Sequence, residues 1–256
     1  MVRILLHGCN GHMGRVVSDL ARGEQDLKIV CGVDINTEQH YDFPVFGTMK
    51  EAAGTAVDVI VDFSTAKAVD PVIDFAAEQG VPAIICTTAL TEAQLQHLEE
   101  ASKKTAILRS ANMALGVNLL MKLAADAAKV LRQNGFDIEI VEEHHRRKID
   151  APSGTALAIA DKINEACGGD LQYNYGRADR HEARPKDEIG ISAVRGGTIP
   201  GNHDVIFAGE DEVIRIQHTS YSRSIWAKGA FSAARYLNGK PAGYYTMMDV
   251  IGDAIG

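Results

Sequence analysis

Residues 142–148 hold the densest chemistry in the sequence, because five successive side chains, His144 to Lys148, can carry positive charge. The run leads into a predicted helix start, where Ser153, Gly154 and Thr155 can present hydroxyl and backbone N–H donors to an anion. Histidines, a lysine and a helix N-terminus together indicate a carboxylate-binding pocket with a proton donor. The alternative is a solvated, basic surface run.

A second candidate site is the glycine-rich loop Gly8–Gly14, between the first predicted strand and the first predicted helix. Small residues let the backbone approach a pyrophosphate, which the helix N-terminus then binds. Asp34 ends the second predicted strand, 20 residues after Gly14, where an acidic group bonds ribose hydroxyls. The context indicates a nicotinamide or flavin dinucleotide, and the alternative is an ordinary strand–helix turn.

The residues around Asp34 also bear on the choice between NADH and NADPH. A carboxylate at this position repels a 2′-phosphate, and the following Ile35 and Asn36 offer no cation to bind one. We therefore expect a preference for NADH.

The other histidines and the cysteines fit no metal or redox motif. The histidines show neither H-x-x-x-H nor H-E-x-x-H spacing, and none of the four cysteines forms a C-x-x-C pair. We expect no metal, and four reduced cysteines in a cytoplasmic protein. Structural roles are predicted for five histidines: His7, His97, His181, His203 and His218.

The composition excludes several classes of protein. The chain has 256 residues, with 26 Lys and Arg against 34 Asp and Glu, giving a net charge of −8. A general nucleic-acid binder would normally be basic. No apolar run approaches the roughly 18 residues of a membrane helix, and the first residues do not form a signal peptide. The expected partners are therefore small molecules, with no nucleic acid and no membrane.

The first part of the chain alternates short apolar strands with helical patterns. Such alternation predicts βαβ units and a parallel sheet with both faces covered. The predicted strands are Val2–His7, Lys28–Val33, Val57–Phe63, Val81–Thr87 and Ala106–Arg109, and the predicted helices are Met13–Ala21, Ala68–Gln79 and Glu92–Ser102.

The pattern changes to α+β after about Met113. A charged stretch, Arg177–Lys186, is interpreted as a solvated loop, the alternatives being a mobile substrate-domain loop or a subunit contact. Three strands near the end of this part are predicted to be antiparallel. The predicted helices are Val117–Gln133, Gly154–Ala166 and Ala227–Leu237, and the predicted strands are Phe136–Val141, Ile189–Arg195, Asp204–Ala208 and Glu212–His218.

These elements predict an α/β protein with two domains, in keeping with about 150 residues per domain. Residues 1–113 and 224–256 would form a discontinuous, Rossmann-like dinucleotide-binding domain. Residues 114–223 would form a mixed α+β domain.

Residues 142–156, E-E-H-H-R-R-K-I-D-A-P-S-G-T-A, resemble the signature E-x-H-H-x-x-K-x-D-x-P-S-G-T-A of the dihydrodipicolinate reductase family. Gly8–Arg15, Val61–Ser64 and Ser110–Asn118 are similar to other segments of that family, so the resemblance covers nearly the whole chain. It implies NAD(P)H-dependent reduction of 4-hydroxy-tetrahydrodipicolinate to tetrahydrodipicolinate, in the diaminopimelate route to lysine. It also implies a homotetramer, with residues 114–223 as the substrate-binding and oligomerisation domain.

The resemblance assigns roles to individual residues. His144 would be the general acid, and Lys148 would assist protonation and bind a substrate carboxylate. The implied substrate-binding residues are His145, Ser153, Gly154 and Thr155. The implied cofactor-binding residues are Gly8, Cys9, Asn10, Gly11, His12, Met13, Asp34, Cys86, Thr87, Thr88, Ser110, Ala111, Asn112 and Met113.

One segment departs from the family pattern, which reads G-T-T-G where this chain has Cys86-Thr87-Thr88-Ala89. A Cβ at either former glycine would cost about 1 kcal/mol or more if the backbone there has a positive φ. Two other functions remain open at this point. One is another NAD(P)H-dependent imine or amino-acid oxidoreductase on the same scaffold, and the other is a non-catalytic NADH-responsive regulator.

Overall fold

The computed structural model describes residues 1–178 and 180–255, and the chain divides into two compact units. The first unit comprises Met1–Leu115 with Arg223–Gly256, and the second comprises Gly116–Ser222. The predicted domains change over after residues 113 and 223, within two residues of these divisions. Asp179 and Gly256 lie outside the described residues.

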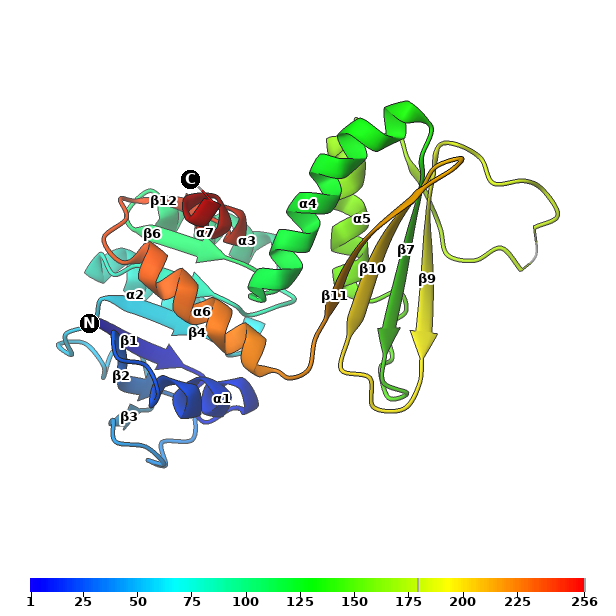
Figure 1. The fold of residues 1–256 in the computed structure, drawn as a ribbon. Coiled ribbons are helices and arrows are strands. Elements are labelled where there is room, and N and C mark those ends of the chain that lie inside the picture. The colour runs from blue at the N-terminus through cyan, green and yellow to red at the C-terminus, as the bar shows by residue number, and fades with distance from the viewer. Residues whose placement is uncertain (179, 256) are drawn as a thin grey trace. The chain divides into compact units, whose positions relative to one another are not determined.

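Seven strands form the sheet of the first unit, and each pair of neighbours is parallel. Their order is β12-β6-β5-β4-β1-β2-β3 (Figure 1). The central strands are continuous apolar runs, because helices cover both faces of the sheet. The strands are β1 Val2–His7, β2 Leu27–Val33, β3 Val45–Phe46, β4 Val59–Asp62, β5 Ala83–Ile85, β6 Ala106–Arg109 and β12 Gly243–Tyr245.

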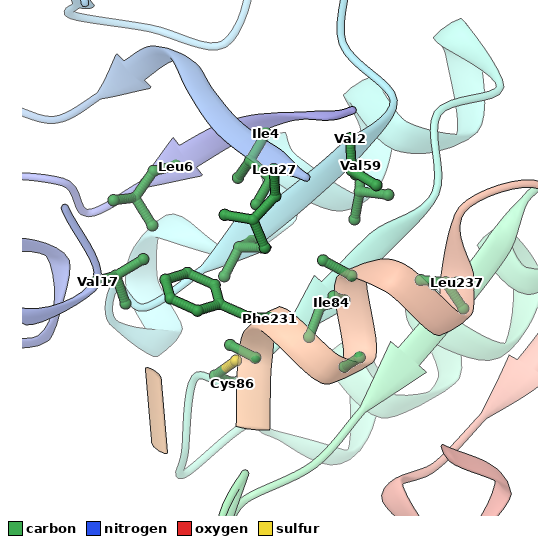
Figure 2. Close-up of a cluster of buried hydrophobic side chains, with 14 of the residues drawn as sticks. Val2, Ile4, Leu6, Val17, Leu27, Val59, Ile84, Cys86, Phe231 and Leu237 are labelled. Carbon is green, nitrogen blue, oxygen red and sulfur yellow. The ribbon is translucent and has the colours of Figure 1, made fainter. Parts of the chain in front are cut away.

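Helices from the two ends of the chain cover one face of this sheet, and two helices between residues 70 and 102 cover the other face. α1 (His12–Ala21), α6 (Ser224–Leu237) and α7 (Met247–Ile255) contribute to the first core. α2 (Asp70–Gln79) and α3 (Glu92–Ser102) contribute to the second. Figure 2 shows the Phe231 ring of α6 lying among Val17, Ile84 and Cys86. The last part of the chain thus completes the core of the first unit.

Three of these elements, β3, β12 and α7, were not predicted. Strands of two and three residues are too short to show a period of two in the sequence. The predicted helix Ala68–Gln79 is divided into a 3₁₀ turn, Ala66–Ala68, and α2, which begins at Asp70. Pro71 lies in the first turn of α2, where its missing N–H leaves no hydrogen bond unmade.

The second unit is a mixed five-stranded sheet with two helices packed on one face. The strand order is β11-β10-β7-β9-β8, and α4 and α5 supply one side of the core (Figure 1). The elements are α4 Leu115–Leu131, β7 Asp137–His144, α5 Gly154–Ala166, β8 Gln172–Asn174, β9 Glu188–Arg195, β10 Asn202–Ala208 and β11 Val213–Thr219.

Two predictions for this sheet are corrected. β9 was expected to be antiparallel, but it runs parallel to both β7 and β8. A long connection containing α5 separates β7 from β9, which is what a parallel crossover requires. β7 was also expected to end near Val141, whereas it continues to His144. Its alternating burial therefore places Glu142 and His144 on one face of the sheet and Glu143 on the other.

The charged stretch Arg177–Lys186 is not simply solvated, because three of its arginines form ion pairs with the sheet. Arg177 and Arg184 pair with Glu139 of β7, at 2.7 and 2.8 Å. Arg177 and Arg180 also pair with Glu188, a carboxylate that is almost fully buried at the start of β9. A buried carboxylate needs such partners to stay charged, so the segment is held by the sheet it borders.

The loop after β5 has one strained position, Ala89. Ala89 has a φ of 57° and is the one non-glycine residue with positive φ in the described parts of the chain. Cys86, the other residue that replaces a family glycine, does not share this conformation. The expected cost of a Cβ at a position of positive φ therefore applies to Ala89 and not to Cys86.

Replacing Ala89 with glycine should stabilise the protein. Alanine in the left-handed region costs about 1–2 kcal/mol, and glycine costs about 0.5–1 kcal/mol in chain entropy. We expect Ala89→Gly to raise the free energy of unfolding by about 0.5–1 kcal/mol, measured from the urea midpoint. Ala53→Gly, at an exposed turn position with ordinary φ, is the control and should lower the midpoint. A lower midpoint for Ala89→Gly would contradict the assignment of strain.

Candidate active site

The glycine loop connects β1 to α1 and is built for close approach. A Cβ on Gly14 would lie 2.1 Å from the carbonyl oxygen of Gly8, and Gly8 itself has a φ of +76°. Gly11 is the N-cap of α1 and makes no side-chain hydrogen bond. The backbone N–H groups of the first turn can therefore bind an anion. The loop therefore fits the pyrophosphate of a dinucleotide.

Asp34 shapes this loop from the end of β2. Its carboxylate accepts hydrogen bonds from the backbone N–H of Asn10 at 2.9 Å and of Asn36 at 3.0 Å. The side-chain amide of Asn10 in turn donates to the backbone carbonyl oxygens of Asn36 and Glu38, at 2.6 and 2.8 Å. Each carboxylate oxygen has a second lone pair, so Asp34 can still accept from a hydroxyl.

A pocket in the first unit brings together residues from four predicted segments. Six of the predicted cofactor residues line it, and Trp226, which was not predicted, joins them from α6. The indole N–H of Trp226 donates to Oδ1 of Asn112 at 3.1 Å and so ties α6 to the predicted segment Ser110–Met113. The lining residues are Met13, Phe63, Ser64, Cys86, Thr87, Thr88, Ala111, Met113 and Trp226.

A fully buried carboxylate, Asp62, connects the strand ends in the first unit that carry these loops. It lies opposite His7 in the β1–β4 register and 2.7 Å from His7 Nδ1. Thr87 donates its hydroxyl to Asp62 at 2.6 Å, and the backbone N–H of Ser64 donates at 3.2 Å. The network fixes the loop that begins at Cys86. Burial raises the pKa of the Cys86 thiol well above its ordinary value, so this thiol stays protonated and packs.

In the second unit, a buried carboxylate occupies the centre of the predicted catalytic segment. Glu142 is fully buried, and its Oε2 lies 2.5 Å from Nδ1 of His144. Arg195 donates from both terminal nitrogens, at 2.7 Å to Oε2 and 2.6 Å to Oε1. The backbone N–H of Ser153 also donates to Oε1, at 2.9 Å. The predicted acid, His144, is thus held by a group that was not predicted to be functional.

Ser153 and His203 form the layer next to this cluster. The Ser153 hydroxyl accepts from the N–H of Ala156, as the cap of α5, and lies 3.0 Å from Nε2 of His203. The His203 ring meets the His144 ring edge to face, with centroids 5.3 Å apart. Burial, together with the neighbouring His144, lowers the pKa of His203 to about 4. His203 is therefore uncharged at neutral pH.

Lys148 and the start of α5 already hold a carboxylate. Lys148 Nζ lies 2.8 Å from Oδ1 of Asp150. The hydrogen bond from Lys148, with help from the backbone N–H of Gly154, lowers the pKa of Asp150 below its ordinary value. An ammonium group and a helix start therefore stabilise a carboxylate of the chain itself. His145 is half-buried and follows directly on β7.

Residues 1–178 and 180–255 contain neither a cluster of metal ligands nor a membrane-spanning helix. No group of three or more His, Cys, Asp or Glu side chains in these ranges is arranged to hold a metal ion. No helix in the same ranges is long and apolar enough to span a bilayer. The four cysteines are free, and three of them are buried.

Sequence reasoning missed Glu142, Arg195, His203, Asp62 and Trp226. Glu142 could have been found, because it stands two residues before His144 in a strand and so shares its face. Arg195 lies opposite His144 in the β7–β9 register, and only that pairing brings the two together.

Comparison with known proteins agrees with the resemblance found in the sequence. The family models for the N-terminus and the C-terminus of dihydrodipicolinate reductase match residues 2–113 and 116–251. A relative from Caldanaerobacter subterraneus subsp. tengcongensis, named 4-hydroxy-tetrahydrodipicolinate reductase, is 51% identical over 98% of both chains. One of the same name from Clostridium tetani is 45% identical over 96% of both chains.

The fold is also similar to a solved structure. Dihydrodipicolinate reductase from Paenisporosarcina sp. TG-14, solved with bound dipicolinate, superimposes with a TM-score of 0.82 and 26% identity. The alignment covers 96% of this chain and 97% of that one. Both family models together span almost the whole sequence. The chain therefore belongs to the dihydrodipicolinate reductase family.

Proposed function

We propose that this protein reduces 4-hydroxy-tetrahydrodipicolinate to tetrahydrodipicolinate with a reduced nicotinamide dinucleotide, in the diaminopimelate route to lysine. The observation that carries the proposal is the buried Glu142–His144 pair, which lies within the family signature beside Lys148 and the start of α5. The relatives' shared name and the dipicolinate bound to the solved relative support the choice of substrate.

The cofactor site is proposed on the first unit. Gly8–Met13 would hold the pyrophosphate at the start of α1, and Asp34 would accept from a ribose hydroxyl. The remaining proposed contacts come from Cys86–Thr88 and Ser110–Met113, most of which line one pocket with Trp226. When bound, the reduced nicotinamide supplies the hydride.

The second unit supplies the acid and the carboxylate-binding groups. His144 would donate a proton to the ring as negative charge develops there, a task that suits a histidine near neutral pH. Lys148 would bind one substrate carboxylate and assist this protonation. His145, Ser153, Gly154 and Thr155 would bind the substrate, Ser153 mainly by capping α5. A substrate carboxylate at Lys148 would replace Asp150, which occupies that position in the structure.

The proposed assembly is a homotetramer, and one face of the second sheet supports contact between copies of the chain. The face opposite α4 and α5 carries apolar side chains on four strands, of which Val194 is 45% exposed and Val213 is 56% exposed. The apolar residues of this face are Val141, Val194, Ile206 and Val213. The proposal includes the reducing cytoplasm as location, in keeping with the free cysteines.

The activity can be tested by following nicotinamide absorbance while the aldolase-derived substrate is generated in situ. Wild-type protein should oxidise the cofactor, and His144→Gln should lose about 10²-fold in kcat with little change in cofactor affinity. His181→Gln makes the same substitution on an exposed loop of the same unit and serves as the control. Unchanged kcat in His144→Gln would remove His144 from the role of acid.

Cofactor preference is a separate prediction. The Asp34 carboxylate should make kcat/KM for NADH at least about tenfold higher than for NADPH, a difference of about 1.4 kcal/mol. Asp34→Asn should narrow the ratio, because the repulsion of a 2′-phosphate is lost. Glu38→Gln, which neutralises an exposed carboxylate in the same segment, should leave the ratio unchanged. A tenfold preference for NADPH in the wild type would refute the prediction.

The assembly is tested by light scattering coupled to size-exclusion chromatography. We expect a mass about four times the 27.6 kDa of one chain. Val194→Glu should reduce the mass, because a charge in an apolar contact between copies cannot be desolvated without a partner. Val130→Glu changes another exposed valine, on α4, and should leave the mass unchanged. A monomeric wild type would contradict the homotetramer.

A further inference from the structure

We propose that Glu142 is the positioning residue of the acid, holding His144 with a proton on Nδ1 so that Nε2 is the nitrogen that donates. Arg195 acts through Glu142 by sharing its charge. The inference rests on the proposed function, since it concerns the same acid, but its central claim concerns the ring's tautomer and can be measured without turnover.

The geometry of β7 brings Glu142 and His144 together. Glu142 and His144 are two residues apart in a strand with alternating burial, so both project from the same face. Oε2 of Glu142 lies 2.5 Å from Nδ1 of His144. An ionised carboxylate can only accept, so Nδ1 must carry the proton in the neutral ring as well as in the imidazolium. The proton that His144 can release is therefore the one on Nε2.

Glu142 remains ionised although it is fully buried. Burial alone would raise the pKa of Glu142, but hydrogen bonds from Arg195, His144 and the Ser153 N–H outweigh it and lower the pKa below its ordinary value. Four donor nitrogens converge on the two carboxylate oxygens. They use the four lone-pair positions of the group, so no proton is needed on the carboxylate.

Arg195 is fixed at the end of β9 by further hydrogen bonds. Besides Glu142, its guanidinium donates to the carbonyl oxygens of Val194 at 2.7 Å and Asp150 at 2.6 Å. Because Arg195 offsets the charge of Glu142, the carboxylate orients the ring without binding the imidazolium as tightly as an unshared carboxylate would. An acid needs this balance, since the proton must leave during the reaction.

The other charged and titratable groups near the ring do not supply this function. His203 of β10 faces His144 edge on, and its lowered pKa keeps it uncharged. Lys148 is paired with Asp150. Burial lowers the pKa of His218 on β11, which favours its uncharged form. Glu142 is thus the carboxylate that touches the ring.

The Nε2 side of the ring lies against Gly201. A Cβ at Gly201 would be 3.0 Å from Nε2 of His144, so any larger residue would crowd the nitrogen that donates. The two nitrogens therefore have different surroundings: a carboxylate at Nδ1, and a backbone without a side chain at Nε2.

The direct test is nitrogen NMR of histidine-labelled protein, with the His144 signal assigned by its loss in His144→Gln. At a pH where the ring is neutral, we expect the wild type to show the Nδ1–H tautomer. Glu142→Gln should lose this signature, and Glu142→Asp should retain it. A wild-type ring in the Nε2–H form would overturn the proposal, whether or not the protein reduces the proposed substrate.

The kinetic test uses the pH profile of kcat/KM in the same variants. The acid must be protonated, so activity falls on the alkaline side of the profile. Removing the charge in Glu142→Gln should move that limb about one pH unit or more to lower pH, with the KM for the cofactor unchanged. Arg195→Gln, which leaves the carboxylate unshared, should move the limb to higher pH.

The matched control is Glu143→Gln, the same substitution one residue along β7 on the opposite face. Glu143 accepts from the Asn202 amide at 2.8 Å and does not face His144. Glu143→Gln should show the same His144 tautomer as the wild type, and the alkaline limb of its kcat/KM profile should lie at the same pH. A limb that moves equally in Glu142→Gln and Glu143→Gln, or in neither, would overturn the proposal.

Discussion

The buried carboxylate of Glu142 is the constraint on which the second unit depends. An ionised group with no exposure is costly unless every lone pair is satisfied, and removing one partner of a buried ion pair costs about 3–5 kcal/mol. The four donors come from β7 itself, from β9 and from the start of α5. Satisfying this one charge therefore fixes where α5 begins and how far β7 and β9 remain paired.

The first unit uses the same arrangement with different partners. Asp62 is fully buried at the end of β4, and its oxygens are occupied by His7, Thr87 and the N–H of Ser64. In both units, a buried carboxylate lies where a strand ends and a loop of proposed function begins. Hydrogen bonds to a fixed charge give such a loop a defined conformation.

The sequence predicted those features whose residues are neighbours in the chain. The glycine loop and the capped start of α5 were found because strand, turn and helix signals follow one another locally. The parallel course of β9, the three short edge strands β3, β8 and β12, and the partners of His144 were not found. Arg195 reaches Glu142 from 53 residues away through strand pairing, and no local pattern encodes that register.

That Arg195 reaches Glu142 only through strand pairing has a chemical consequence for the signature at residues 142–156. The signature contains the proposed acid His144, Lys148 and the cap of α5, but Arg195, which pairs with Glu142, lies on another strand. With an uncharged residue in place of Arg195, the same signature would leave Glu142 free to stabilise the imidazolium, and His144 would release its proton less readily. The strength of the proposed acid would therefore depend on the pairing of β7 with β9, which the signature alone does not encode.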